Sequence, residues 1–301
     1  MQSAAFYSKR TPAELIYDLA FLLKRCQLSL IVGAGVSRDL GMPLWRDLAK
    51  QCLQMAGFKE TAESIDQFTT TSKLLELMGL VTRQRDYAQY IDLVHAAIYS
   101  NGMPDSLGAK PLLRALGALC MGSTRGRITD IINYNFDCIL EQYFICHGYV
   151  IQVLSDVPTL TAANDVRIWH PHGYVPFDKF SGAVGQISSK LVFDSESADD
   201  FLKNRNQPWM DVLRFMYVSK VFLAVGLSGE DPMTNLVLDA ASKAVDESRP
   251  IGFWLHKKGD IPPDVIKKLT ERSIVTVAFD DFGEYPEYLM RVCALAAGPT
   301  L

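Results

Sequence analysis

Four short segments carry the residues whose types and spacing could do chemistry. They are a glycine turn at Gly33–Ser37, a polar loop at Asn133–Asp137, two histidines in His170–Gly173, and a second glycine turn at Gly226–Asp231. Glycine lets a main chain approach a ligand closely, and free amides in such a turn attract a phosphate. An asparagine side chain both donates and accepts hydrogen bonds, and an imidazole can take up a proton near neutral pH. Together these groups suit a site that holds a phosphorylated ligand and moves a proton.

The first glycine turn follows an apolar run, Leu28–Val32, and precedes a predicted helix, Leu44–Met55. A strand, a glycine turn and a helix are the parts with which a doubly wound sheet binds a nucleotide phosphate. Arg38 stands where the dinucleotide pattern G-x-G-x-x-G has its third glycine, so the turn by itself also fits a simple tight turn. If it binds phosphate, we expect three residues to offer their main-chain amides: Gly33, Ala34 and Gly35.

The elements that must position these segments alternate between strands and helices. This alternation predicts an α/β fold, a Rossmann-like doubly wound parallel sheet covered on both faces. Because ligands bind beyond the carboxyl ends of such strands, all four segments should face one crevice. The expected strands are 28–32, 128–133, 149–153, 166–169, 220–225, 251–255 and 274–279.

One stretch breaks the alternation. Apolar residues recur at helical spacing from about residue 57 to residue 125, and no strand pattern interrupts them. We therefore expect a single domain over residues 1–301. Its core would span about 10–56 and 126–301, with an all-helical insertion at about 57–125 between the first and second strands. His95 lies on an apolar face of this insertion, which favours a core or interface histidine over a functional one.

Composition narrows the class of protein. The 301 residues are 49% hydrophobic and carry a net charge of −4, so a broad nucleic-acid footprint is not expected. No apolar run reaches the roughly 18 residues of a membrane span, and the N-terminal stretch lacks the apolar core of a signal peptide. The six cysteines include no C-x-x-C pair, so we expect no metal site and a reducing, cytoplasmic setting. Cys138, Cys146 and His147 are closer together, but packing on the inner face of one helix explains them better than a metal.

The four segments, in their order, resemble motifs of the sirtuin (SIR2) family. The first, GAGVS, continues into Gly41–Arg46 (GMPLWR), which is similar to the family's G-I-P-x-F-R. Asn133–Asp137 stands in the place of T-x-N-x-D, His172-Gly173 in that of His-Gly, and Gly226-x-Ser228 in that of G-x-S. The chain departs from the family in having Leu44 where an acidic residue is usual and Asn133 in place of threonine. It also lacks the two C-x-x-C pairs of the zinc module.

This pattern is similar to the SIR2-like domains of bacterial anti-phage defence proteins. The resemblance implies an NAD⁺ glycohydrolase that releases nicotinamide and ADP-ribose and so depletes NAD⁺ in an infected cell. It also implies a homo-oligomer, and a regulatory partner such as a HerA-like ATPase in related systems. Two other readings stay open: an NAD-dependent protein ADP-ribosyltransferase or deacylase, and a non-enzymatic sensor of NAD or ADP-ribose.

The resemblance assigns catalysis to Asn135 and His172. Asn135 would orient the ribose and a water, and His172 would take a proton from a ribose hydroxyl or from water. His170 would be a supporting partner or simply buried. Residues expected to bind the nucleotide are Gly33, Ala34, Gly35, Ser37, Arg46, Asp137, Gly226, Ser228 and Asp231.

Three of these binding residues have a plain structural alternative. Asp137 would either brace its loop or cap the next helix, and Asp231 would either hold the adenosine end or serve only as a helix N-cap. Arg46 would bind a phosphate or pair with a carboxylate such as Asp47 or Asp137. The glycine- and serine-rich loop at Phe180–Ser189 is either a mobile flap beside the site or a surface hairpin.

Overall fold

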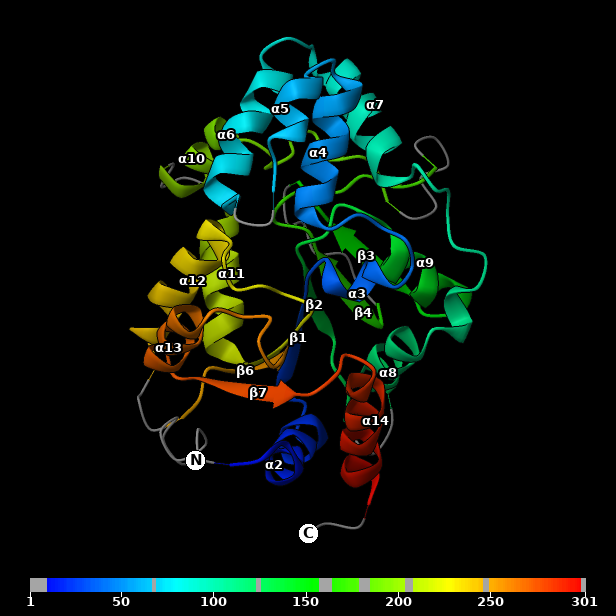
Figure 1. Cartoon of the computed structure of the whole chain (residues 1–301). Coiled ribbons are helices and arrows are strands. Elements are labelled where there is room, and N and C mark those ends of the chain that lie inside the picture. The colour runs from blue at the N-terminus through cyan, green and yellow to red at the C-terminus, as the bar shows by residue number, and fades with distance from the viewer. Residues whose placement is uncertain are drawn as a thin grey trace.

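A computed structural model of the chain describes residues 10–66, 69–122, 126–156, 164–178, 185–203, 208–245 and 249–298. These residues form a seven-stranded, all-parallel sheet in the order β3-β4-β2-β1-β5-β6-β7. Figure 1 shows this sheet at the centre of the molecule, with helices on both sides. The strands are β1 (Leu28–Val32), β2 (Asp130–Asn133), β3 (Ile151–Leu154), β4 (Val166–Trp169), β5 (Val221–Val225), β6 (Gly252–Lys257) and β7 (Ile274–Phe279).

Helices separate most of the strands, but the described residues between β3 and β4 form none, and two helices lie between β4 and β5. The longest series of helices lies between β1 and β2. α2 (Pro12–Lys24) precedes β1. Between β1 and β2 lie α3 (Gly35–Arg38), α4 (Trp45–Met55), α5 (Lys59–Glu63), α6 (Thr71–Thr82), α7 (Tyr87–Ile98), the short 3-10 helix η1 (Leu107–Ala109) and α8 (Pro111–Cys120). After β2 come α9 (Ile139–Cys146), α10 (Ser195–Lys203), α11 (Pro208–Ser219), α12 (Pro232–Ser242), α13 (Pro263–Glu271) and α14 (Glu284–Ala297). In the described part of the chain, no helix is long and apolar enough to cross a membrane.

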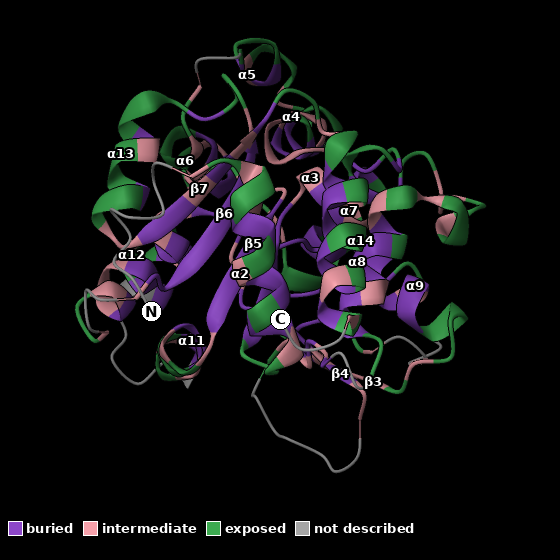
Figure 2. Cartoon of the chain, turned by 90° about the horizontal axis from the view of Figure 1, so that it is seen from below, coloured by how far each residue is buried: buried purple, intermediate pink, exposed green. Residues whose placement is uncertain are grey.

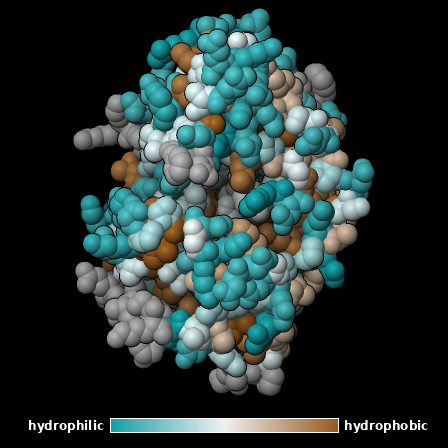
Figure 3. Space-filling model, in the orientation of Figure 1, coloured by the Kyte–Doolittle hydropathy of each residue, from teal (hydrophilic) through white to brown (hydrophobic). Residues whose placement is uncertain are grey.

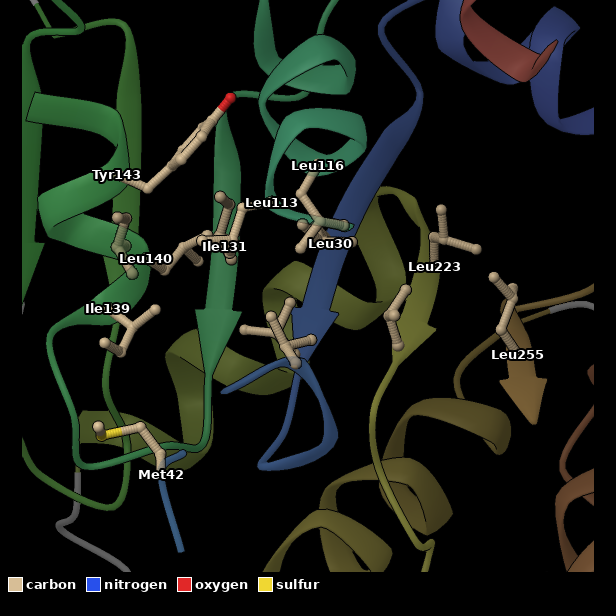
Figure 4. Packing of buried hydrophobic residues seen from close by; sticks show 14 of the residues in the cluster. Leu30, Met42, Leu113, Leu116, Ile131, Ile139, Leu140, Tyr143, Leu223 and Leu255 are labelled. Carbon is tan, nitrogen blue, oxygen red and sulfur yellow. The ribbon is translucent and has the colours of Figure 1, made fainter. Parts of the chain in front are cut away.

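The central strands β1, β2 and β5 are buried along their whole length, whereas the edge strand β3 is mostly half-buried. Figure 2 shows β5 and β6 in the purple of buried residues. Successive side chains of β1 point to opposite sides: Leu30 joins the core that contains α2, α8, α9 and α14, while Ile31 joins the core that contains α11, α12 and α13. In Figure 4, Leu113 and Leu116 of α8 lie against Leu30 and Ile131 of the sheet. This double covering explains why the central strands β1 and β5 are largely apolar.

The predicted fold class is confirmed, and the differences are at element ends. β2 begins at Asp130 rather than at residue 128, and β3 spans residues 151–154 rather than 149–153. The helix after β2 begins at Ile139 rather than at residue 136, because Asp137 turns its carboxylate onto the amide of Ile139. The predicted start of α12 is confirmed, since Asp231 accepts a hydrogen bond from the Thr234 amide at 2.7 Å and Pro232 is the first helical residue.

The helices between β1 and β2 pack in two groups. α4 packs on α5, α6 and α7, and α10 from later in the chain joins them against α6, at the top of Figure 1. α8 packs instead against α14 on a face of the sheet. The boundaries predicted for the insertion therefore stay a prediction. Of the loop predicted as a flap or hairpin, residues 180–184 lie outside the described residues.

Candidate active site

The two glycine turns touch each other where β1 and β5 end. The Gly33 amide donates to the carbonyl of Val225 at 3.1 Å, and the Gly35 amide donates to the carbonyl of Gly226 at 3.0 Å. A Cβ atom on Gly33 would lie 2.7 Å from the Gly226 oxygen, and one on Gly35 would lie 2.8 Å from the Gly226 Cα. Gly226 itself has φ +75°, the left-handed region that glycine adopts without strain. The glycines are therefore required for the close approach of the two turns.

This packing changes the role predicted for the first turn. The amides of Gly33 and Gly35 are already bonded to protein carbonyls, and those of Val36 and Ser37 donate to the carbonyls of Gly33 and Ala34. Among the described residues, the Ala34 amide has no acceptor, so it is the group of the predicted three that can meet an anion. The prediction that Gly33 and Gly35 also offer their amides does not fit this geometry.

A cavity of ≈ 550 Å³ opens beside these turns. It lies at the point where the strand order reverses, between β1 and β5, and α4 and α6 line its other side. The surface in Figure 3 is hollowed between the upper group of helices and the lower half of the molecule. Every residue predicted to bind or react lines the cavity except Ser37, which is buried behind it.

Asn135 reaches the cavity with its side chain fixed in one orientation. Its Nδ2 donates to the Gly33 carbonyl at 3.1 Å and to the Ser37 hydroxyl at 3.4 Å. A carbonyl oxygen can only accept, so the amide nitrogen must face Gly33. The Oδ1 atom of Asn135 is then the group of this side chain that can accept a hydrogen bond from a water or a ribose hydroxyl.

Asp137 lies behind Asn135 and joins two elements. Its Oδ1 accepts from the Ile139 amide at 3.0 Å and from the Ser37 hydroxyl at 3.2 Å. Burial raises the pKa of this carboxyl to about 6, and nearby Glu141 adds to the rise, against the opposing effect of the Ile139 hydrogen bond. Of the two structural alternatives predicted for Asp137, the geometry fits bracing of the loop; its bond to Ile139 holds the first residue of α9, but the N-cap residue is Cys138.

His172 is held between aromatic rings and a carboxylate. The Tyr134 ring lies 4.7 Å from the imidazole centroid at 58°, and the Phe136 ring lies at 6.4 Å on a 34° tilt. The Nε2 atom is 3.6 Å from Oδ2 of Asp231, a distance too long for a hydrogen bond but close for two charges. Burial would raise the pKa of Asp231, yet the charge of His172 and the hydrogen bonds from Thr234 hold it below its usual value.

Asp231 therefore has two partners, the start of α12 and His172. The sequence predicted the first of these and missed the second, because the two residues lie on segments far apart in the chain. It also missed Tyr134, whose hydroxyl pairs with that of Tyr217 at 2.9 Å. In the sequence, only its position inside the polar loop Asn133–Asp137 indicates that Tyr134 lies at the site.

The remaining predicted residues occupy less defined positions. Ser228 is exposed and its hydroxyl accepts from the Glu230 amide at 3.4 Å. Arg46 is half-buried at the cavity wall and donates to the Thr69 carbonyl at 3.4 Å. His256 and Lys257, at the end of β6, also line the cavity and were not singled out from the sequence. Burial lowers the pKa of His256.

The other histidines and cysteines lie apart from the cavity. His95 is bonded to the Phe177 carbonyl at 2.8 Å, which fits the interface role predicted for it. Cys138 is buried but Cys146 is exposed, so the two do not share an inner helix face as predicted. In the part of the chain that the structure describes, no group of three or more His, Cys, Asp or Glu side chains could hold a metal ion.

Three comparisons place the chain among known proteins. The sequence profile of the SIR2-like domain matches residues 129–282. No curated protein matches the sequence. A solved structure reported under "Structural Basis for the Mechanism and Regulation of Sir2 Enzymes" is 14% identical over 93% of this chain and 96% of its own, with a TM-score of 0.45, a likeness too low to argue from.

Proposed function

Since this chain belongs to the SIR2-like domain family, we propose that it is an NAD⁺ glycohydrolase that releases nicotinamide and ADP-ribose. The observation that carries the proposal is the convergence of the two glycine turns, Asn135 and the His172–Asp231 pair on one cavity. NAD⁺ use follows from the family, and hydrolysis is the reaction that these groups support best.

The reaction needs one proton acceptor. When the bond from the ribose anomeric carbon to nicotinamide breaks, its electron pair passes to the ring nitrogen, so nicotinamide leaves neutral and needs no proton. Water adds to the oxocarbenium-like carbon and loses one proton. His172 takes up that proton, and Asn135 Oδ1 accepts a hydrogen bond from the water and so aims its oxygen at the carbon.

Asp231 supports this role of His172 in two ways. Its negative charge lies 3.6 Å from Nε2, which electrostatically favours the tautomer that carries a proton on Nε2 and leaves the lone pair on Nδ1. Once His172 has taken a second proton, the nearby negative charge stabilises the imidazolium. At the other end of the ligand, we expect the Ala34 amide to meet a phosphate, and Arg46 adds a cation at the cavity wall.

The direct test is to incubate the purified protein with NAD⁺ alone and identify the products. The proposal predicts equal amounts of nicotinamide and ADP-ribose without any peptide. Products that appear only with an acylated peptide or an acceptor protein would indicate a deacylase or a transferase. Binding of NAD⁺ without turnover, with every candidate activator present, would indicate a sensor.

The proposal extends to a role in anti-phage defence, which rests on the sequence resemblance. An unrestrained NAD⁺ hydrolase would kill its own cell, so we expect activity to await self-assembly or a partner such as a HerA-like ATPase. Mass photometry and NAD⁺ measurements in infected cells, with the wild-type chain and with His172→Ala, test this. Full activity of a lone monomer, or unchanged NAD⁺ during infection, would contradict it.

A further inference from the structure

Behind Asn135 lies a closed ring of hydrogen bonds that the proposed mechanism does not use. His170 and Glu141 are fully buried, and His170 Nε2 lies 2.8 Å from Glu141 Oε1. The Asn133 Nδ2 donates to the same oxygen at 3.4 Å, and Asn133 Oδ1 accepts from the Asn135 amide at 3.0 Å. The ring closes where His170 Nδ1 meets the Asn135 carbonyl at 3.0 Å.

The ring holds both polar groups of the Asn135 main chain. Its N–H is fixed through Asn133 and its C=O through His170, while its side chain is fixed separately by Gly33 and Ser37. The position of the Oδ1 atom is thus fixed both by the main-chain hydrogen bonds and by those of the side chain. Misplacing a reacting group by about 1 Å can lower the rate on the order of 100-fold. The hydrogen bonds that fix Asn135 should therefore affect kcat.

The protons of the ring follow from the donors and acceptors. The Asn135 carbonyl only accepts, so His170 Nδ1 must carry a proton. A second proton lies between His170 Nε2 and Glu141, either as imidazolium and carboxylate or as neutral imidazole and carboxylic acid. The pair is neutral in both forms, which permits its complete burial, whereas either partner alone would leave an unpaired polar group.

Resting on the proposed function, we propose that His170 and Glu141 are positioning residues that set the place of Asn135 for catalysis. Neither residue lines the cavity, and the hydrogen bonds of the ring connect them to it through Asn135. Glu141 Oε2 has no hydrogen-bond partner among the described residues. Leaving that oxygen unpaired costs stability, which suggests that Glu141 is kept for the position of its other oxygen.

Glu141→Gln tests the proposal because it keeps the shape of the side chain. If the oxygen of the new amide took the place of Oε1, His170 would have to donate from both ring nitrogens and stay cationic without a carboxylate beside it. If the amide nitrogen took that place, it could donate to neutral His170 but could not accept from Asn133, so in either orientation the ring is disrupted. We expect kcat for nicotinamide release to fall about 10- to 100-fold, with the dissociation constant for ADP-ribose within about 2-fold of wild type. Asp130→Asn is the matched control, a buried carboxylate at the opposite end of β2, and should leave kcat unchanged.

A double-mutant cycle separates positioning from general support of the fold. If Glu141 acts through Asn135, Glu141→Gln should change the residual single-turnover rate of Asn135→Ala by less than about 2-fold. An equal loss in both backgrounds, or a normal kcat for Glu141→Gln beside an active wild type, would overturn the proposal. A wild type that releases no nicotinamide would instead overturn the proposed function.

The ring can also be tested without any variant. In the wild-type protein labelled with ¹⁵N-histidine, His170 should show a protonated Nδ1 and a hydrogen-bonded proton at Nε2. A His170 with an unprotonated Nδ1 would overturn the proposal, even if Glu141→Gln did not fold.

Discussion

The two ends of strand β2 place buried carboxylates in opposite electrostatic settings. At its start, Asp130 lies 2.8 Å from the Arg167 Nε and 3.0 Å from the Lys220 Nζ, and accepts from the Thr129 hydroxyl. Burial would raise the pKa of Asp130, but the Lys220 charge and these hydrogen bonds hold it below its usual value. Just past the other end, burial, with the nearby charge of Glu141, raises the pKa of Asp137 to about 6 despite the opposing effects of the Ile139 and Ser37 hydrogen bonds and of His170.

We propose that this difference separates a stabilising cluster from a functional one. The Asp130 cluster balances its charge and joins β2 to β4 and to the start of β5. At the carboxyl end, His172 Nε2 and Glu141 Oε2 have no hydrogen-bond partner among the described residues. Buried groups with unmet hydrogen bonds and shifted pKa values gather at sites that bind ligands and move protons. We therefore propose that β2 serves stability at one end and the proposed chemistry at the other.

Removing the imidazole should have the largest effect. We expect His172→Ala to lower kcat for nicotinamide release about 1,000-fold, since a positioned general base contributes roughly that much. His147→Ala is the control, because His147 stacks on Tyr143 beyond the end of α9 and away from the cavity. Normal turnover in a folded His172→Ala protein would overturn the site assignment.

The raised pKa of Asp137 predicts a pH-dependent stability. A carboxyl whose folded pKa is raised favours folding when protonated, so its contribution is complete below about pH 4 and is lost as the pH rises through about 6. Asp137→Asn keeps the acceptor oxygen and removes this loss, so it should gain up to about 3 kcal/mol on wild type between pH 4 and 7. Urea unfolding at several pH values measures this, and parallel curves for the two proteins would contradict it.

Asp231→Asn should separate the two roles of Asp231. Asparagine caps helices about as well as aspartate, so the start of α12 should be kept, and the variant should lose only the stability that the lowered pKa of Asp231 supplies above its unfolded pKa. Losing the charge beside His172 should lower kcat about 10- to 100-fold, a typical cost for a residue that orients a reacting group. A kcat equal to that of wild type would show that the 3.6 Å approach has no catalytic role.

Asp130→Asn should have the smallest effect, and on stability alone. We expect a loss of about 1.5 kcal/mol at pH 7, between the values for exposed and for buried ion pairs. A carboxylate with a lowered pKa stabilises the fold above its unfolded pKa, so this loss should vanish as the pH falls through the folded pKa. A change in kcat of the folded variant would contradict the assignment of stability alone to the start of β2.

Much of the fold could be predicted from local patterns. Buried parallel strands are continuous apolar runs, and Asp231-Pro232 is a helix start that depends on neighbouring residues only. The parallel sheet then brings strand ends to one edge, which is why four segments spread over the sequence could be placed at one cavity. The packing partners of the helices were harder to predict, because the apolar face of α8 does not show which helix covers it, and it packs on α14.

The details of the site depend on contacts between distant segments. The close approach of Gly33 and Gly35 to Gly226 uses amides that the motif offered to a phosphate. Glu141 is a single acidic residue in an apolar helix, and no pattern in the sequence pairs it with His170.

A crystal structure of the His172→Ala protein with NAD⁺ tests the central claim most directly, because the variant should bind the nucleotide without cleaving it. The account predicts the pyrophosphate against the Ala34 amide and the nicotinamide ribose beside Asn135 Oδ1. A nucleotide bound elsewhere, or a cavity still empty at saturating NAD⁺, would contradict it.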